Sequence, residues 1–489
     1  MRAALGLDVG TTSVKAVVVG ENGELVGEGR SGTLPMRAPA NGWAVQQTSD
    51  LRDAVIECLR EATSSLPTGV EVACLSAAVQ SGSVATIDRS GTIADDLTTW
   101  MDTRAEPIVE GWIADGTANA IRRVSGWTVH PGQGLPQLAW IKANDQSTWD
   151  SIGHIAAADD LVTHWLTNSW VTNPSSAAGM ALLDISTGEW SEELAGLLDI
   201  APEWISEVRP CGATVGPITA EVAAATGLNE NVTVVNGGHD QTCTALALGV
   251  TKPAQAVLAG GTAWVLTSVV PVAETHAIPK AMNVSFHVLP ELRTASKYLG
   301  GMGASIEWIA TTGDRSPDRS DRFFNLDAQL ADTTINETSP YFQLAASDTP
   351  DASSPGAGKF LNATPDTTDA QRARAVMEYA AFTVKTSLLA LREAQRPQSL
   401  TVVGGVTRSP GWTQLIADVC ELPINETAEA SLPAIGAAML GGVSQGVFSD
   451  FEAASRSLSV DTTALSPDPS NAVLYQRRYQ THLTQELNQ

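Results

Sequence analysis

The sequence predicts an α/β protein built from two related domains. The chain has 489 residues, more than the roughly 100 to 200 that one domain usually holds. Short apolar runs alternate with segments of helical period, which is typical of an α/β protein. A strand, a glycine turn and a second strand open the chain over 3–19, and this pattern returns over 256–268. We therefore expect an N-terminal domain over 1–245 and a C-terminal domain over 246–489, although glycine turns are common in other α/β proteins.

The individual elements follow from hydrophobic period and turn residues. Apolar runs at 3–7 and 14–19 predict strands joined by a turn over 8–13, and 24–27 returns after a second turn, which makes a β-meander. From Thr48 apolar residues recur at three- and four-residue steps, so a helix begins there. We further expect strands over 71–79, 83–87, 232–235 and 400–403, helices over 191–198, 218–225, 242–248 and 412–420 and from Ala370 onward, and an exposed loop over 347–358.

The chain is strongly acidic. It has 54 Asp and Glu against 29 Lys and Arg, a formal net charge of −25, and 43% of its residues are hydrophobic. The apolar content excludes a disordered chain, and the negative charge argues against nucleic acid as a partner. An anionic ligand must therefore be held by local backbone donors, a helix N-terminus or a metal ion.

Cysteine spacing and hydropathy bear on the compartment. The five cysteines lie far apart without paired spacing, which argues against a disulfide framework or a zinc site. Asp8 comes too early for a secretory leader, and no apolar run approaches the roughly 18 residues of a membrane helix. We expect a cytoplasmic protein that has no membrane partner.

The first glycine turn carries a carboxylate and two hydroxyls, in Asp8-Val9-Gly10-Thr11-Thr12. Glycine lets backbone N–H groups approach a phosphate closely, and the hydroxyls can donate to it. A carboxylate fits beside a phosphate only when a divalent cation lies between them. The alternative is a plain hairpin with a solvated aspartate.

Two further glycine turns lie in the second half. Gly260-Gly261-Thr262-Ala263 repeats the first turn, and Gly404-Gly405 follows a strand and precedes a helix, where open α/β sheets bind nucleotides. No Walker A sequence occurs in the chain. A glycine between a strand and a helix is also often purely structural.

Asp240 follows Gly237 and Gly238 at the expected start of a helix. The glycines leave space for a ligand beside this carboxylate, which can then act as a base for a hydroxyl proton. The alternative is a helix cap, the commonest use of an aspartate at this position. We interpret His239 as a packed or surface histidine, because on a helix it would point away from Asp240.

Asp102 and Arg104 follow Trp100 in the segment Trp100-Met101-Asp102-Thr103-Arg104. They form either an ion pair that fixes a loop or part of a polyol site, and we favour the ion pair.

Together these segments resemble the FGGY carbohydrate kinases, a branch of the actin, hexokinase and sugar-kinase superfamily. The resemblance covers nearly the whole chain, and the matching blocks occur in the family's order. The blocks begin at Asp8, Trp43, Trp100, Leu135, Thr172, Gly237, Gly261 and Gly404. They look closest to the blocks of xylulokinases.

The resemblance implies two actin/hexokinase-like (ribonuclease H-like) domains that face each other across a nucleotide and sugar cleft. It implies a phosphotransferase with an alcohol acceptor, which uses ATP to phosphorylate a terminal hydroxyl of a ketopentose-like sugar. Asp240 would be the general base, and Asp8 would hold Mg²⁺. The implied ATP-binding residues are Gly10, Thr11, Thr12, Lys15, Gly261, Thr262, Gly404 and Gly405. The implied sugar-binding residues are Gln80, Ser81, Asp102, Arg104, Asp240 and Gln241.

Three departures from the xylulokinase pattern bear on the substrate. Xylulokinases carry Gln-Met-His-Gly where this chain has Gln80-Ser81-Gly82-Ser83, and Gln137 stands where a lysine is usual. The family's Gly-Glu-Arg-x-Pro is replaced near 346–350, without its arginine. Ribulose, erythritol or another polyol, and gluconate are therefore alternative substrates, and a homodimer is the candidate assembly.

Two other functional classes stay open. The same phosphate motifs occur in Hsp70-like chaperones and actin-like filament proteins, in which the nucleotide drives a conformational or assembly cycle. A degenerate kinase that senses a sugar is the other alternative. The Gly-Gly-x-Asp context of Asp240 favours the kinase over the chaperone and the filament protein.

Overall fold

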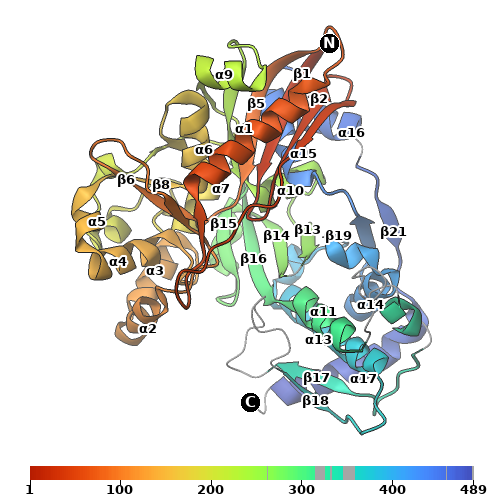
Figure 1. The fold of residues 1–489 in the computed structure, drawn as a ribbon. Coiled ribbons are helices and arrows are strands. Elements are labelled where there is room, and N and C mark those ends of the chain that lie inside the picture. The colour runs from red at the N-terminus through yellow and green to blue at the C-terminus, as the bar shows by residue number, and fades with distance from the viewer. Residues whose placement is uncertain (262, 314–324, 331–332, 345–357, 459, 487–489) are drawn as a thin grey trace. The chain divides into compact units, whose positions relative to one another are not determined.

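The structure, a computed structural model, describes residues 1–489 except 262, 314–324, 331–332, 345–357, 459 and 487–489 (Figure 1). Its contacts divide the chain into two units. The first comprises Met1–Thr251, Met282–Thr294 and Ser431–Val460, and the second comprises Lys252–Ala281, Ala295–Ala430 and Asp461–Gln489. The segment 346–350 lies outside the described residues, and so does the expected loop over 347–358 except for its last residue, Gly358, where a strand begins.

The first unit is organised around a mixed sheet with the strand order β11-β12-β5-β1-β2-β3. Strand β1 is antiparallel to β2 and parallel to β5, so the opening meander of the sequence is confirmed. The strands are β1 (Arg2–Val9), β2 (Val14–Gly20), β3 (Leu25–Arg30), β5 (Glu71–Val79), β11 (Thr214–Pro217) and β12 (Thr233–His239). The helices that pack against this sheet are α1 (Thr48–Ser64), α6 (Ala158–Thr167), α10 (Asp240–Ala247) and α15 (Leu432–Ser444). Helix α9 (Ala220–Thr226) packs against α1, and α16 (Phe451–Leu458) packs against α15.

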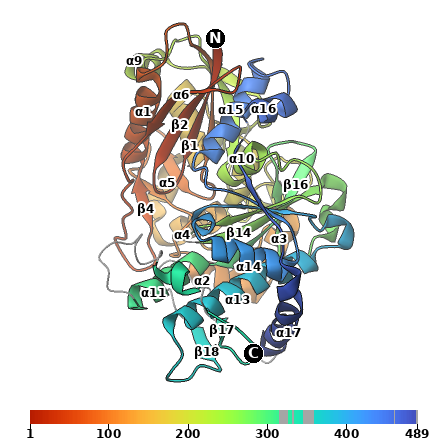
Figure 2. The same cartoon turned by 90° about the vertical axis from the view of Figure 1, so that its right-hand side faces the viewer.

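The two faces of β1 pack against different helices, α1 and α15, which lie on opposite sides of the strand in Figure 2. Leu5 and Leu7 point into the core that includes α1. Gly6 points the other way, and a Cβ on it would lie 1.8 Å from Ala434 O in α15, so glycine is needed there. Because side chains alternate along a strand, Asp8 lies on the same face as Gly6.

A smaller sheet of the first unit has the order β4-β7-β6-β8 and carries its own apolar core. Its strands are β4 (Val45–Gln47), β6 (Val84–Asp88), β7 (Asp96–Thr98) and β8 (Ile152–Ala157), and its helices are α2 (Glu106–Asp115), α3 (Thr117–Ser125), α4 (Gly134–Asn144) and α5 (Gln146–Ser151). The other short elements whose residues lie in the first unit are β9 (Val171–Thr172), α7 (Pro174–Ala177), η1 (Ala178–Met180), α8 (Glu192–Gly196), η2 (Pro202–Trp204), β10 (Glu207–Val208) and β15 (Asn283–Phe286).

Strand β12 is longer than the sequence predicts. The expected strand ends at 235, whereas β12 continues through both glycines to His239 and pairs with β5 across a register shift between Val235 and Gly238. A Cβ on Gly237 would lie 1.7 Å from Ala77 O of β5, so this glycine allows a close approach of two strands rather than a turn. Helix α10 consequently begins at Asp240 and not at Thr242.

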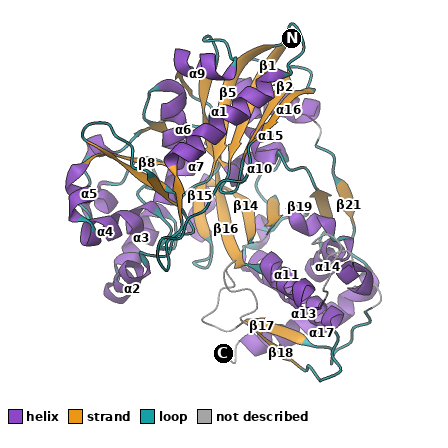
Figure 3. Ribbon diagram, viewed as in Figure 1, coloured by secondary structure: helices purple, strands orange, loops and turns teal. Residues whose placement is uncertain are grey.

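The second unit contains a sheet with the strand order β16-β14-β13-β19-β20-β21 (Figure 3). Its strands are β13 (Ala256–Gly260), β14 (Trp264–Pro271), β16 (Leu292–Gly300), β19 (Leu400–Val403), β20 (Ile424–Thr427) and β21 (Thr463–Leu465), with a separate hairpin of β17 (Tyr341–Leu344) and β18 (Gly358–Leu361). Its helices are α11 (Met302–Gly313), α13 (Asp369–Ala390), α14 (Pro410–Cys420) and α17 (Pro469–Glu486), and its shorter turns are η3 (Val272–Ala277), η4 (Glu393–Gln395) and η5 (Gly405–Arg408). The second glycine hairpin and the long helix from Ala370 are thus confirmed.

Candidate active site

Asp8 and Asp240 lie close enough in the first unit for their charges to interact. Asp8 is 7% exposed near the end of β1, and the Lys15 Nζ atom on β2 lies 3.9 Å from its Oδ2 atom. Burial, and then the charge of Asp240, raises the pKa of Asp8 to about 7, while Lys15 opposes this rise. Two carboxylates that the sequence places far apart therefore share one site.

Asp240 occupies the first turn of α10, and its two carboxylate oxygens have different surroundings. Oδ1 accepts a hydrogen bond from the main-chain N–H of Gln241 at 2.6 Å. The Nε2 atom of His239 lies 3.0 Å from the same oxygen. Among the residues that the structure describes, Oδ2 accepts no hydrogen bond, and the Asp240 side chain is 29% exposed. One oxygen is therefore held and the other is open.

The His239 side chain is packed, at 14% exposed, but the prediction that it points away from Asp240 is wrong. His239 is the last residue of β12 and the N-cap of α10, with φ −62° and ψ 137°. Because His239 precedes the helix, the helical spacing assumed from the sequence does not apply to it, and its Nε2 atom reaches Asp240 Oδ1 at 3.0 Å. The error arose from the strand boundary, because the glycines suggested that the strand had already ended.

A chain of hydrogen bonds supports the residue before Asp240 from within the first unit. The His239 N–H donates to Ser175 Oγ at 2.9 Å, and Ser175 Oγ donates to Asn173 Oδ1 at 2.6 Å. Asn173 Nδ2 donates in turn to Asp159 Oδ2 at 3.3 Å. Asp159 is 4% exposed, and burial raises its pKa. Sequence reasoning singled out the block that contains Asn173 and Ser175 without finding this supporting role.

Gln80, an expected sugar-binding residue, is 2% exposed and uses both ends of its amide within the protein. Its Oε1 atom accepts from Thr11 Oγ1 at 2.8 Å, and its Nε2 atom donates to Gln46 Oε1 at 3.2 Å. Thr11 Oγ1 also accepts from Trp100 Nε1 at 2.9 Å. The neighbouring Ser81 donates its hydroxyl to Ser176 O at 2.7 Å. This network joins the first glycine turn to the expected sugar-binding segments.

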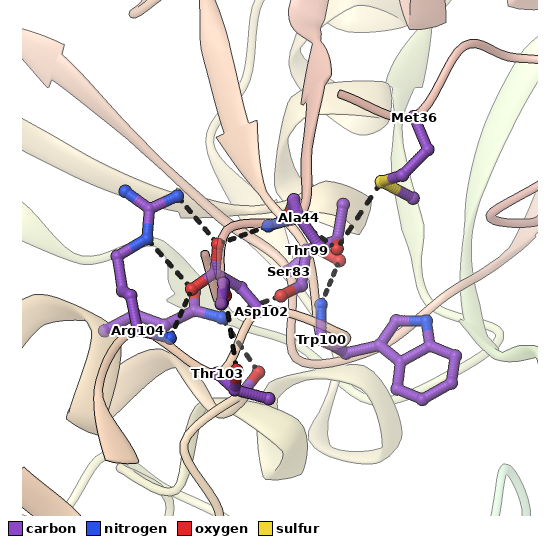
Figure 4. A network of polar contacts seen from close by, with 11 residues as sticks. Met36, Ala44, Ser83, Thr99, Trp100, Asp102, Thr103 and Arg104 are labelled. Carbon is purple, nitrogen blue, oxygen red and sulfur yellow. Dashed lines mark hydrogen bonds and ion pairs between the residues drawn. The ribbon is translucent and has the colours of Figure 1, made fainter. Parts of the chain in front are cut away.

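The predicted ion pair between Asp102 and Arg104 is confirmed (Figure 4). Arg104 Nε and Nη2 donate to the two oxygens of Asp102 at 2.9 and 2.7 Å, and Asp102 also accepts from Ala44 N at 2.7 Å. The guanidinium carbon lies 3.5 Å from the ring centroid of Trp43, a cation–π contact. Asp102 is fully buried, so the pair fixes this loop, and the Trp100 ring extends away from it in Figure 4.

The second unit brings its two expected ATP-binding turns together. Strands β13 and β19 are parallel neighbours, so Gly261 and Gly404 follow them at the same edge of the sheet. Gly404 has φ 93°, and a Cβ on it would lie 3.0 Å from Gly260 O, so this position requires glycine. A Cβ on Gly261 or Gly405 would meet only one atom each, at 3.7 and 3.8 Å. Both turns are open to a ligand, and Thr262 lies outside the described residues.

Asp8 and the glycine turns fit the Mg²⁺ and nucleotide that the sequence implies. A divalent cation beside Asp8 would offset the burial of this carboxylate and its repulsion from Asp240. Gly10 leaves space in the turn, because a Cβ there would meet Ser13 O and Asp8 Oδ1 only at 3.4 and 3.9 Å. No cluster of three or more metal-ligating side chains occurs among the described residues, so oxygens of a nucleotide or water would complete the coordination.

Comparison with known proteins identifies the family. Residues 3–247 match the N-terminal domain of the FGGY family of carbohydrate kinases, and residues 254–445 match its C-terminal domain. The chain belongs to the FGGY family of carbohydrate kinases. This FGGY kinase is a phosphotransferase, and the predicted boundary at 245 stays a prediction that lies near the limits of the two matches.

Relatives of this FGGY kinase include kinases that are named for different substrates. The chain is 26% identical to xylulose kinase of Staphylococcus xylosus over 99% of both chains. It is 25% identical to autoinducer-2 kinase of Escherichia coli (strain K12), covering 96% of this chain and 92% of that protein. The crystal structure of xylulose kinase from Rhodospirillum rubrum has a TM-score of 0.91, with 23% identity over 100% of this chain and 99% of that one. This likeness shows the actin/hexokinase-like fold.

The described residues of this FGGY kinase include no helix that is both long and apolar enough to cross a bilayer.

Proposed function

We propose that this carbohydrate kinase transfers the γ-phosphoryl group of ATP to a terminal hydroxyl of a ketopentose-like sugar, with D-xylulose as the first candidate. The observation that carries the proposal is the Asp8 and Asp240 pair, in which one oxygen of Asp240 stays open. The two lobes would close over ATP and the sugar, which excludes water and limits futile hydrolysis of ATP.

In this proposal Asp240 is the general base. Its Oδ2 atom takes the proton of the acceptor hydroxyl as the hydroxyl oxygen attacks the γ-phosphorus. The new O–P bond forms as the bond to the β-phosphate oxygen breaks, and ADP leaves. Asp8 would hold Mg²⁺, which neutralises charge on the phosphate oxygens when it is bound.

The remaining expected site residues keep their proposed roles. ATP would contact the first turn through Gly10, Thr11 and Thr12, with Lys15 beside Asp8. The Thr11 hydroxyl donates to Gln80, and its main-chain N–H has no acceptor among the described residues, so we assign this N–H to phosphate. Gly261, Thr262, Gly404 and Gly405 would bind the phosphates and adenosine from the second unit.

The sugar-binding set contains both direct contacts and supporting residues. We assign direct contact to Asp240 and Gln241, and to Ser81 as an acceptor, because its hydroxyl already donates to Ser176 O. Gln80, Asp102 and Arg104 are engaged by protein atoms and would shape the pocket through their neighbours.

A coupled assay for ADP tests the proposal with a panel of acceptors. The panel contains D-xylulose, ribulose, erythritol, glycerol, gluconate and autoinducer-2, the last because a relative is named for it. We expect rapid ADP release with one acceptor and slow release without any. Binding of an acceptor, measured by thermal shift, without ADP release would favour the degenerate sugar-sensing protein. No response to any acceptor would favour a chaperone-like or filament-like role.

A further inference from the structure

The imidazole of His239 is the side chain that contacts the proposed base. Its Nε2 atom lies 3.0 Å from Asp240 Oδ1, and the two side chains are 14% and 29% exposed. At this distance a protonated imidazole attracts the carboxylate through its charge. His239 therefore contacts Oδ1, whereas Oδ2 has no protein partner among the described residues.

Oδ1 of Asp240 is held from two directions. The Gln241 N–H donates to it at 2.6 Å, and His239 approaches it at 3.0 Å. Rotation of the carboxylate about its last bond would exchange the two oxygens and break both contacts. The pair of contacts thus favours one orientation of the carboxylate, with Oδ2 facing outward.

His239 itself is fixed by buried polar groups. Its N–H donates to Ser175 Oγ at 2.9 Å, and Ser175 is 1% exposed. Ser175 and Asn173, which bonds to the buried Asp159, extend the chain of hydrogen bonds into the first unit. A residue anchored in this way can hold its neighbour more tightly than a loop residue could.

We propose that His239 is a positioning residue that orients Asp240 so that Oδ2 meets the acceptor hydroxyl. This inference rests on the proposed function, in which Asp240 is the base. His239 acts through Asp240, and neither binds the sugar nor receives its proton.

Two substitutions of His239 separate positioning from packing. His239→Leu removes the contact, and we expect kcat to fall about 10- to 100-fold while KM for sugar and ATP changes less than about threefold, because a small misplacement of a base slows the chemical step. His239→Gln can place an amide N–H near the position of Nε2, and it should restore much of the lost kcat. The matched control, His276→Leu, changes an exposed histidine of η3 and should leave both constants unchanged.

A double-mutant cycle with Asp240→Asn distinguishes this inference from the proposed function. If His239 acts through Asp240, His239→Leu has no further effect on kcat in the Asp240→Asn background. Near-normal activity of Asp240→Asn alone would overturn the base assignment itself. Loss of activity in Asp240→Asn with unchanged activity in His239→Leu would overturn only the positioning role.

Two further results would also contradict the positioning role. A rise in KM for the sugar at constant kcat in His239→Leu would make His239 a substrate contact. Additive losses in the cycle would make its role independent of Asp240. If His239→Leu fails to fold, as judged by its melting transition, Ser175→Ala removes the acceptor of the His239 N–H instead, and it should lower kcat in the same way while KM stays constant.

Discussion

The two glycine hairpins of the chain share a backbone plan but differ in charge. In the first, Asp8 of β1 pairs in register with Lys15 of β2. In the second, Ala259 of β13 occupies the corresponding place and pairs with Val265. Both turns keep an open glycine, and the first also carries the ionisable pair of Asp8 and Lys15. In the proposed mechanism the first unit would therefore supply the charges for the chemistry, and the second would supply backbone donors for binding.

The largest effect should come from the charges of the first unit. Asp240→Asn keeps the shape of the side chain and removes its basicity, so kcat should fall by about 10² to 10⁴. Sugar binding, measured by calorimetry, should persist. A variant with reduced affinity and unchanged kcat would instead show that Asp240 contacts the sugar without acting as the base, and it would weaken the contrast between the hairpins.

Asp8 should make the stability of the metal-free protein depend on pH. Its pKa is about 7 in the folded chain and 3.8 in the reference state, so between these values the folded protein keeps a proton that the unfolded chain has released. The free energy of unfolding therefore falls as pH rises through this window and levels off above it. Asp8→Asn should remove this dependence and stabilise the protein near pH 8 by up to about 4 kcal/mol.

Urea unfolding in EDTA at several pH values measures this effect. Added Mg²⁺ should stabilise the unsubstituted protein more than Asp8→Asn. If the free energy of unfolding changes with pH in the same way for both proteins, Asp8 has an ordinary pKa.

A smaller effect is expected from the glycines of the second unit. Gly404→Ala forces a Cβ into a backbone with φ 93° and against Gly260 O at 3.0 Å, which should cost about 1 to 3 kcal/mol. KM for ATP should rise, and kcat at saturating ATP should change little. Gly411→Ala in α14 is the matched control, because a Cβ there meets nothing within 4 Å. A fall in kcat with constant KM would break the proposed division between the two hairpins.

The smallest effect concerns the Thr11 hydroxyl in the first turn. Thr11→Val leaves Gln80 Oε1 without its donor in a buried site, which should cost about 1 to 3 kcal/mol of stability by thermal or urea unfolding. KM for ATP should change little, because we assign phosphate binding to the main-chain N–H. A large rise in KM would return that role to the hydroxyl. Thr12→Val, at an exposed neighbour, compares the two hydroxyls directly.

Local patterns predicted much of the fold. The strands of both hairpins, the helix from Thr48 and the strand–glycine–helix order around Gly404 follow from hydrophobic period and turn residues, which act over short stretches. The ion pair of Asp102 and Arg104 was predictable because the two residues are close in sequence.

The rest depended on contacts between distant segments. The continuation of β12 to His239 follows from its pairing with β5, which no local pattern reveals. For the same reason the contact between His239 and Asp240 was not predicted. The bond from His239 to Ser175 joins two blocks that the sequence shows only as separate motifs. Asp8 and Asp240 could each be suspected as site residues because both are carboxylates, but only the folded structure shows that their charges interact.

Helix α15 has a consequence for how the protein is made. It belongs to the first unit by its contacts, yet it is translated after most of the second. Until it leaves the ribosome, the side of β1 that carries Gly6 lacks its covering helix, and the nascent first unit exposes apolar surface. The packing around β1 is thus completed only when nearly the whole polypeptide has emerged. A fragment that stops at residue 245 lacks α15 and should aggregate.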